Sequence, residues 1–175
     1  MANKLKIIHV VSSLNIGGAE RFVIDLGEKQ LSLGNDVAIL SFGSNEDTLV
    51  DVAKNKGLET YIIEKAKSLI GQLKILLALK KFDIIHIHTA YALKPLSIVM
   101  KVIGGKPCVY TRHGAAQNNS LAWQKIHQHF KRHIKAMSFV SQEACDIFKH
   151  NYPWHDIPMS VVDNGVLGWK IISFI

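Results

Sequence analysis

The sequence predicts an α/β fold, with one doubly wound sheet of six or seven parallel strands and helices on both faces. Short apolar runs rich in Ile and Val alternate with longer segments of helical periodicity along the 175 residues. Near-continuous apolar runs are typical of strands buried on both faces. Strict alternation with helices calls for crossover connections, which make neighbouring strands parallel. The chain is long enough for one domain with its own core.

The first strand is expected at 4–13, where the run KLKIIHVVSS is almost continuously apolar. The helix that follows has an apolar face of Ala19, Phe22, Val23, Leu26 and Leu33. Gly34-Asn35 ends this helix as a C-cap does. The same reasoning predicts further strands at 36–44, 58–64, 83–90, 106–114, 136–142 and 158–165. Helices are expected between them at 45–57, 68–82, 93–105, 120–135 and 143–152, with Ser68 as an N-cap.

The net charge of +7 is unevenly distributed along the chain. Residues 84–142 contain eight Lys or Arg, six His and no acid. A positive surface that faces an anionic partner is one interpretation, and a basic solvated face without a partner is the other. The helix 120–135, with four basic residues, is the expected site of peripheral contact with anionic lipid headgroups. RNA-binding motifs are missing from the sequence, so no nucleic-acid partner is expected.

The cysteines and the apolar runs indicate a cytoplasmic protein. Cys108 and Cys145 have neither metal-binding nor redox spacing, so free thiols are expected and no metal site is predicted. No apolar run approaches the length of about 18 residues that a spanning helix needs. The basic-to-apolar N-terminus is interpreted as the first strand rather than a signal peptide. The expected location is the cytoplasm, at the inner face of the cell membrane.

Ligands of such sheets gather at the carboxyl ends of the strands. The residues found there form the expected rim of the site: Ser12, Ser13, Asn15, Gly17, Gly18, Gly43, Ser44, His88, Thr89, Tyr91, Arg112, His113, Gly114, Ser141, Gln142, Asn164 and Gly165.

The glycine pair Gly17-Gly18 stands where the first strand passes into the first helix. It is not a dinucleotide fingerprint, because the spacing differs and the second strand ends in LSFGS without an acid. Free N–H groups at a helix N-terminus favour an anion, and glycine lets a phosphate approach the backbone. The alternative is a turn that needs positive φ.

Five motifs in order resemble the retaining GT-B glycosyltransferases of family 4. They are HVVSSLNIGGAERFVIDLGEKQLSLGNDVAILSFG, FDIIHIHTAYA, YTRHGA, SFVSQEA and VVDNGV. The resemblance implies that residues 1–166 form the first of two Rossmann-like domains, the N-terminal, acceptor-side half of a GT-B fold. Residues 167–175 do not resemble the family's linker, since Leu167 follows where the family usually has Asp. Residues 167–175 are therefore expected to form an atypical tail at the position where the donor domain of the family would begin.

The resemblance also implies an activity. A hexosyltransferase would move a sugar from a nucleotide-sugar donor, with retention of configuration, to a cell-surface polysaccharide, lipopolysaccharide or lipid-linked glycan. No cofactor besides the donor substrate is expected. The donor residues belong to the second domain, so the 175-residue chain alone is expected to be inactive. Self-association is expected through apolar surface that a second domain would cover. The alternative is a non-catalytic remnant or binding module.

Site residues follow from the same resemblance. Gly17 and Gly18 would face the donor diphosphate, and His113 would lie at the reaction centre as the catalytic residue. The expected acceptor contacts are Asn15, His88, Tyr91 and Arg112. Structural roles remain the alternatives: a histidine under the sheet end for His113, and a surface cation for Arg112.

Neighbouring residues are assigned structural roles. His86 is expected on the face opposite His88, packed against a helix. Glu20 is expected as a carboxylate in the helix dipole, and Trp123 and Phe130 are expected in the core.

Overall fold

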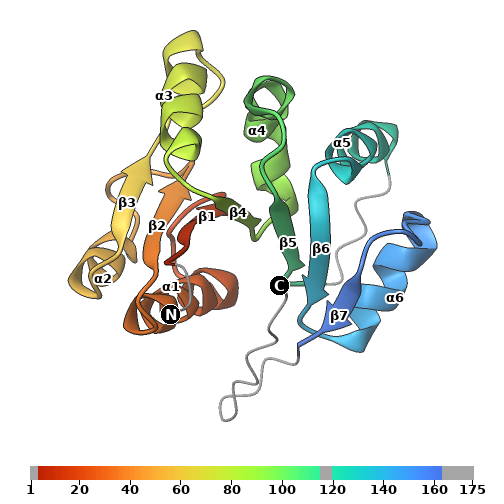
Figure 1. The fold of residues 1–175 in the computed structure, drawn as a ribbon, viewed down its shortest axis with the longest axis horizontal. Coiled ribbons are helices and arrows are strands. Elements are labelled where there is room, and N and C mark those ends of the chain that lie inside the picture. The colour runs from red at the N-terminus through yellow and green to blue at the C-terminus, as the bar shows by residue number, and fades with distance from the viewer. Residues whose placement is uncertain (1–3, 115–119, 163–175) are drawn as a thin grey trace.

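A computed structural model describes residues 4–114 and 120–162 (Figure 1). Seven strands form one sheet in the order β3-β2-β1-β4-β5-β6-β7, and every neighbouring pair is parallel. The predicted fold class is therefore confirmed. The strands are β1 (Lys6–Val11), β2 (Asp36–Ser41), β3 (Glu59–Ile62), β4 (Ile84–Ile87), β5 (Cys108–Arg112), β6 (Ile134–Phe139) and β7 (Met159–Val161).

Six helices connect these strands and cover both faces of the sheet. They are α1 (Gly18–Ser32), α2 (Val50–Asn55), α3 (Leu69–Lys80), α4 (Ala90–Ile103), α5 (Leu121–Lys131) and α6 (Gln142–Asn151). Apolar side chains of α1 and α2 form one core with the sheet, and those of α3 to α6 form a second, larger core. Figure 1 shows α3, α4 and α5 next to one another along one border of the ribbon.

The alternation of side chains along the strands separates two environments. Ile8 and Val10 of β1 belong to the larger core, together with Ile85 and Ile87 of β4. The residues between them point to the side of α1, because successive strand residues face opposite ways. On that side, β1, β4, β5 and β6 carry a row of polar side chains: His9, His86, Thr111 and Ser138. A buried polar row of this kind needs hydrogen-bond partners within the fold.

Several helix boundaries differ from the sequence prediction: the helix expected over 45–57 spans only Val50–Asn55, and two other differences have a cause in the hydrogen bonds. The helix expected over 120–135 ends at Lys131, and Ile134 already belongs to β6. The His133 carbonyl accepts from the Cys108 N–H at 3.1 Å, so sheet pairing begins where helical periodicity seemed to continue. The fourth helix begins at Ala90 instead of residue 93, because the Thr89 hydroxyl accepts from the Ala92 N–H at 3.3 Å. The predicted cap at Ser68 is confirmed by a 3.0 Å hydrogen bond from the Gly71 N–H.

Several predictions concern cysteines, membrane spans and the chain end. Cys108 and Cys145 are buried and free. Among residues 4–114 and 120–162, no helix combines the length and the apolar character needed to cross a membrane. The predicted boundary at residue 166 and the tail 167–175 lie outside the described residues, as do Asn164 and Gly165.

Candidate active site

The loop that follows β1 is tied to the loop that follows β2. The Asp47 carboxylate accepts a hydrogen bond of 2.8 Å from the Leu14 N–H. A Cβ at Gly43 would overlap this carboxylate and lie 3.0 Å from the Ser13 Cα. The two loops therefore interlock behind the exposed tip that carries Asn15.

Gly17 and Gly18 do not serve a positive-φ turn. Gly17 is the N-cap of α1, with an extended φ of −166° that any residue adopts. In the described part of the chain, positive φ is found at four other glycines and at neither of these. The turn alternative is therefore wrong for both positions.

The N-terminus of α1 is open at Gly18. A Cβ at Gly18 would meet nothing within 4 Å, and the residue is exposed. By helix geometry, the first N–H groups of α1 have no partner within the helix. A Cβ at Gly17 would overlap the Glu20 carboxylate, which folds back against the helix start as predicted. The site can thus receive an anion at Gly18, with Glu20 as a competing negative charge.

Four histidines gather on the α1 side of the sheet: His9 and His86 lie within β1 and β4, and His88 and His113 directly follow β4 and β5. The ring centroids of His86 and His88 lie 3.9 Å apart, and His9 lies about 5 Å from each. The prediction that His86 lies on the opposite face from His88 is therefore wrong. Strand residues two positions apart point to the same side of a sheet.

Three of these rings and Gln30 of α1 form a continuous series of hydrogen bonds. We call this series the histidine relay; its members are Gln30, His9, His88 and His113. Gln30 Oε1 lies 2.7 Å from His9 Nε2, and His9 Nδ1 lies 2.9 Å from His88 Nε2. His88 Nδ1 lies 3.1 Å from His113 Nε2. At the end of the relay, His113 Nδ1 is buried without a hydrogen-bond partner among the described residues.

Burial keeps the relay uncharged. It lowers the pKa of His9 and of His113 to about 4, and it lowers the pKa of His86 and His88 well below the ordinary value. Neighbouring imidazoles add to this effect at His86 and His88, because a second positive charge so close is unfavourable. All four rings are therefore neutral at pH 7.

Three of the histidines could hold a cation. His9, His86 and His88 can each offer one nitrogen, and these atoms lie within 4.8 Å of one another. Neutral imidazole is a common metal ligand. Both ring nitrogens of His9 and of His88 already form hydrogen bonds, so a cation would replace the proton shared by these two rings. Sequence reasoning missed the trio, although His86 and His88 have the spacing that places two side chains on one strand face.

The Arg112 side chain points away from the face of the sheet that carries His113. The Arg112 side chain is only 6% exposed, and its guanidinium carbon lies 5.5 Å from the centre of the Phe148 ring of α6. It therefore packs on the α6 side of the sheet, opposite the polar row.

Tyr91 is 65% exposed and meets the Trp123 ring edge-on at 5.5 Å. Lys94 Nζ lies 4.3 Å from the centre of the same indole ring. Trp123 is half-buried in this surface patch and belongs to neither core, so its predicted core position is wrong. Phe130 is fully buried, as predicted.

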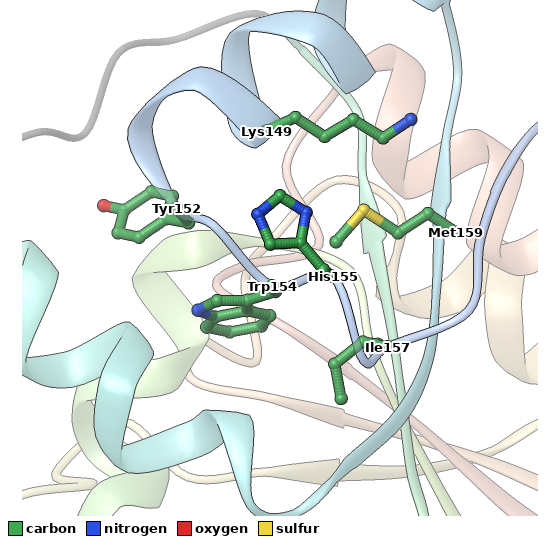
Figure 2. Close-up of a pocket in the computed structure, with 6 residues that line it drawn as sticks. All are labelled: Lys149, Tyr152, Trp154, His155, Ile157 and Met159. Carbon is green, nitrogen blue, oxygen red and sulfur yellow. The ribbon is translucent and has the colours of Figure 1, made fainter.

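A pocket with a volume of about 330 Å³ lies beside α6. Figure 2 shows His155 standing between Lys149 and Trp154 in this pocket. Its remaining lining residues are Tyr152, Ile157 and Met159. Sequence reasoning did not single out this pocket, because its aromatic residues follow the helix without a recognisable motif. It contains no member of the histidine relay.

The sequence matches the family model described as Glycosyltransferase Family 4 over residues 16–166. The chain belongs to glycosyltransferase family 4. The match confirms the resemblance drawn from the five motifs. No curated protein sequence matches the chain significantly.

Solved glycosyltransferase structures share its fold. HepE of Anabaena, solved with UDP, superposes with a TM-score of 0.74 at 17% identity, covering 92% of this chain and 44% of HepE. A glycosyltransferase from Rickettsia africae gives 0.72 at 22% identity, covering 94% and 44%. The lipopolysaccharide outer core galactosyltransferase WaaB gives 0.60 at 14% identity, covering 93% and 46%. The chain thus has the fold of the N-terminal half of GT-B glycosyltransferases and spans less than half the length of these relatives.

Proposed function

We propose that this chain is the acceptor-side half of an enzyme that transfers a hexosyl group from a nucleotide sugar to a glycan or lipid-linked acceptor. The observation that carries the proposal is the proximity of the open α1 N-terminus to His113. Phe22, one turn along α1 from Gly18, meets the His113 ring edge-on at 5.0 Å. A donor phosphate at Gly18 and a sugar hydroxyl at His113 would therefore be held on one side of the sheet.

The residues have distinct roles in this proposal. The N–H groups at Gly17 and Gly18 bind the donor diphosphate as the bond from the sugar anomeric carbon to phosphate oxygen breaks. His113 accepts a hydrogen bond from a sugar or acceptor hydroxyl through Nδ1. The acceptor oxygen forms the new bond to the anomeric carbon, and its proton passes to the departing phosphate oxygen. Residues 84–142 contain no carboxylate that could act as a nucleophile, which is compatible with transfer on one face and retention of configuration.

Sugar transfer is tested in a two-domain protein in which this chain is fused to the donor-binding second domain of a GT-B glycosyltransferase. We call this protein the transfer form. UDP-glucose and other nucleotide sugars are offered with glycan and lipid-linked acceptors, and the product is identified by mass spectrometry. His113→Ala should lower turnover per folded molecule, while the melting temperature falls by only a few degrees because His88 Nδ1 loses its hydrogen-bond partner. Binding of sugars without any transfer by the transfer form would instead support the non-catalytic binding module.

We further propose that the acceptor is met at an anionic membrane surface, through what we call the α3–α4 face. This face is defined by the exposed apolar side chains of two adjacent helices: Leu69, Ile70, Leu73, Leu77, Ile98 and Val102. Leu69 is 87% exposed and Ile70 is 69% exposed. A helix with apolar residues on all sides is normally covered on all sides, so this surface calls for a partner.

Charge favours a lipid surface as that partner. Between Glu64 and Glu143 the only acid is Asp83, while Lys74 and Lys101 lie exposed on α3 and α4. Apolar side chains flanked by lysines suit the boundary between acyl chains and anionic headgroups.

The helix expected to make this contact, α5, is less suitable than α3 and α4. Lys131 forms an ion pair of 2.7 Å with Asp156, and Arg132 donates to His133 at 3.1 Å. Part of its basic charge is therefore used within the fold.

Co-sedimentation with vesicles tests the α3–α4 face. Binding to phosphatidylglycerol vesicles should exceed binding to phosphatidylcholine vesicles and should fall with salt. Replacing Leu69, Ile70 and Leu73 by Ser should weaken binding more than about a hundredfold, because each buried side chain of this size is worth roughly 1.5–3 kcal/mol. Val52→Ser, an exposed position on α2, is the matched control and should bind normally.

Light scattering distinguishes a second copy of the chain as the occupant. An oligomer that the triple Ser variant disperses, without any vesicle binding by the parent chain, would show that self-association covers this face and would overturn the membrane proposal. Equal binding to neutral and anionic vesicles would remove the role of charge.

A further inference from the structure

We propose that Gln30 acts as a positioning residue that sets the tautomer of His113 through the histidine relay. In this tautomer His113 Nδ1 carries no proton and can accept a hydrogen bond. The use of that nitrogen in sugar transfer rests on the proposed function, whereas the tautomer itself does not. Gln30 lies in the last third of α1, with two buried histidines between it and His113.

The direction of the relay follows from its first member. The carbonyl oxygen of a glutamine side chain accepts hydrogen bonds and cannot donate them. His9 Nε2, 2.7 Å from Gln30 Oε1, must therefore carry the hydrogen. A neutral imidazole has one N–H, so His9 Nδ1 holds a lone pair and accepts.

The same step repeats twice along the relay. His88 Nε2 donates to His9 Nδ1 over 2.9 Å, which leaves His88 Nδ1 as an acceptor. His113 Nε2 donates to His88 Nδ1 over 3.1 Å, which leaves His113 Nδ1 with its lone pair. Each ring uses its single proton once, and every hydrogen bond has one donor and one acceptor.

Burial maintains this arrangement. His9 and His88 are fully buried, and the lowered pKa values keep one proton on each ring. A second proton on His88 or His9 would set two N–H groups against each other at hydrogen-bond distance. His86 stands beside the relay and is bound separately, with Nε2 lying 2.7 Å from Thr111 Oγ1.

The free end of the relay is suited to a hydroxyl ligand. His113 Nδ1 is a buried acceptor without a partner in the described part of the chain. An unsatisfied buried acceptor is costly, and a donated O–H from a bound sugar removes that cost. The opposite tautomer would present an N–H and would instead favour an oxygen without a hydrogen, such as a ring or phosphate oxygen. Gln30 thus selects which ligand group His113 can hold.

Nitrogen-15 NMR of the histidine-labelled chain tests the inference directly, since long-range proton–nitrogen spectra distinguish the two tautomers of each ring. His113 should carry its proton on Nε2. Gln30→Glu keeps an acceptor and should leave this tautomer in place. Gln30→Lys offers only donors, so the relay should reverse and the proton of His113 should move to Nδ1.

Three results would overturn the inference. The first is a wild-type His113 with its proton on Nδ1, and the second is a folded Gln30→Lys variant with an unchanged His113. The third is a stoichiometric metal ion in the purified protein held by His9, His86 and His88, since it would displace the shared proton. If Gln30→Lys does not fold, Gln30→Met replaces it: His113 should then show both tautomers, and an unchanged single tautomer would count against the relay.

Turnover of the transfer form separates this inference from the proposed function. Gln30→Lys should lower kcat by about tenfold or more, because the bound hydroxyl loses its hydrogen-bond acceptor and faces an N–H instead, with little change in donor KM. The Gln30→Glu variant should keep a kcat close to that of the parent transfer form, because a carboxylate also accepts a hydrogen bond from His9 Nε2. Reversed tautomers with unchanged kcat would leave the relay intact and refute the role given to His113.

Discussion

Replacing Gly18 by Ala separates the two reasons for a glycine at the start of α1. A Cβ there meets nothing within 4 Å, and the residue does not have positive φ. Ala at such a compatible position typically raises the free energy of unfolding by about 0.4–1 kcal/mol through the unfolded state. For a domain of this size, that corresponds to a melting temperature roughly 1–4 °C higher.

The effect on transfer should be opposite in sign and much larger. The added methyl group occupies the approach of the donor phosphate to the helix N-terminus. A displacement of the reacting groups by about 1 Å can cost about a hundredfold in rate. Turnover of the Gly18→Ala transfer form should therefore fall by one to two orders of magnitude, while its melting temperature holds or rises slightly. Product formation by mass spectrometry and thermal melts by fluorescence measure the two quantities.

Gly27→Ala is the matched control, because a Cβ there would lie 2.9 Å from Leu58 Cδ2 and 3.5 Å from Val37 Cγ1. Overpacking of this kind costs about 1–3 kcal/mol, so this variant should melt earlier yet keep its turnover per folded molecule. The reasoning is refuted if Gly18→Ala lowers the melting temperature as Gly27→Ala does and leaves turnover per folded molecule unchanged.

Three further predictions concern other parts of the molecule. Glu20→Gln should lower the donor Kd of the transfer form in calorimetry, because it removes a negative charge that competes with the donor phosphate at the α1 N-terminus. The same substitution should lower the free energy of unfolding by about 0.3–1 kcal/mol, because that charge also stabilises the helix dipole. Asp47→Ala should cost about 1–3 kcal/mol in urea unfolding, because the buried Leu14 N–H loses its partner; an unchanged midpoint would contradict the loop connection. Burial lowers the pKa of His127 to about 4, below its unfolded value, so the stability that its neutral ring contributes is complete above pH 6.5 and is lost as pH falls towards 4. Between pH 7 and pH 5 the parent chain should lose about 2 kcal/mol more than His127→Phe, and parallel pH profiles would refute this.

The order of the elements could be predicted because it depends on local pattern. Apolar runs and helical periodicity report burial on one or both sides of a segment, and the sheet of seven parallel strands follows from their alternation. Boundaries were less accurate where a helix passes directly into a strand. Ile134 continues the apolar spacing of α5, yet its position in β6 is decided by pairing with β5.

The site could be predicted only in part. Gly18, Asn15 and His113 follow strand ends and lie where ligands of such sheets gather. Arg112 immediately precedes His113, but alternation turns its side chain to the α6 side, where it packs on Phe148. The position of Trp123 beside Tyr91 and Lys94 likewise depends on how α4 and α5 pack, which helical spacing does not report.

The sequence by itself determined the family, the order of helices and strands, and the placing of two glycines at a helix start. These features are encoded by residues close together in the chain. Only the tertiary structure decided that Gln30, His9, His88 and His113 form one hydrogen-bonded relay, since 21 positions separate Gln30 from His9 and 79 separate His9 from His88. Parallel pairing places β1 beside β4 and β4 beside β5, and the packing of α1 brings Gln30 to His9. Burial in that arrangement then sets the charge of each ring, which no local pattern of residues can specify.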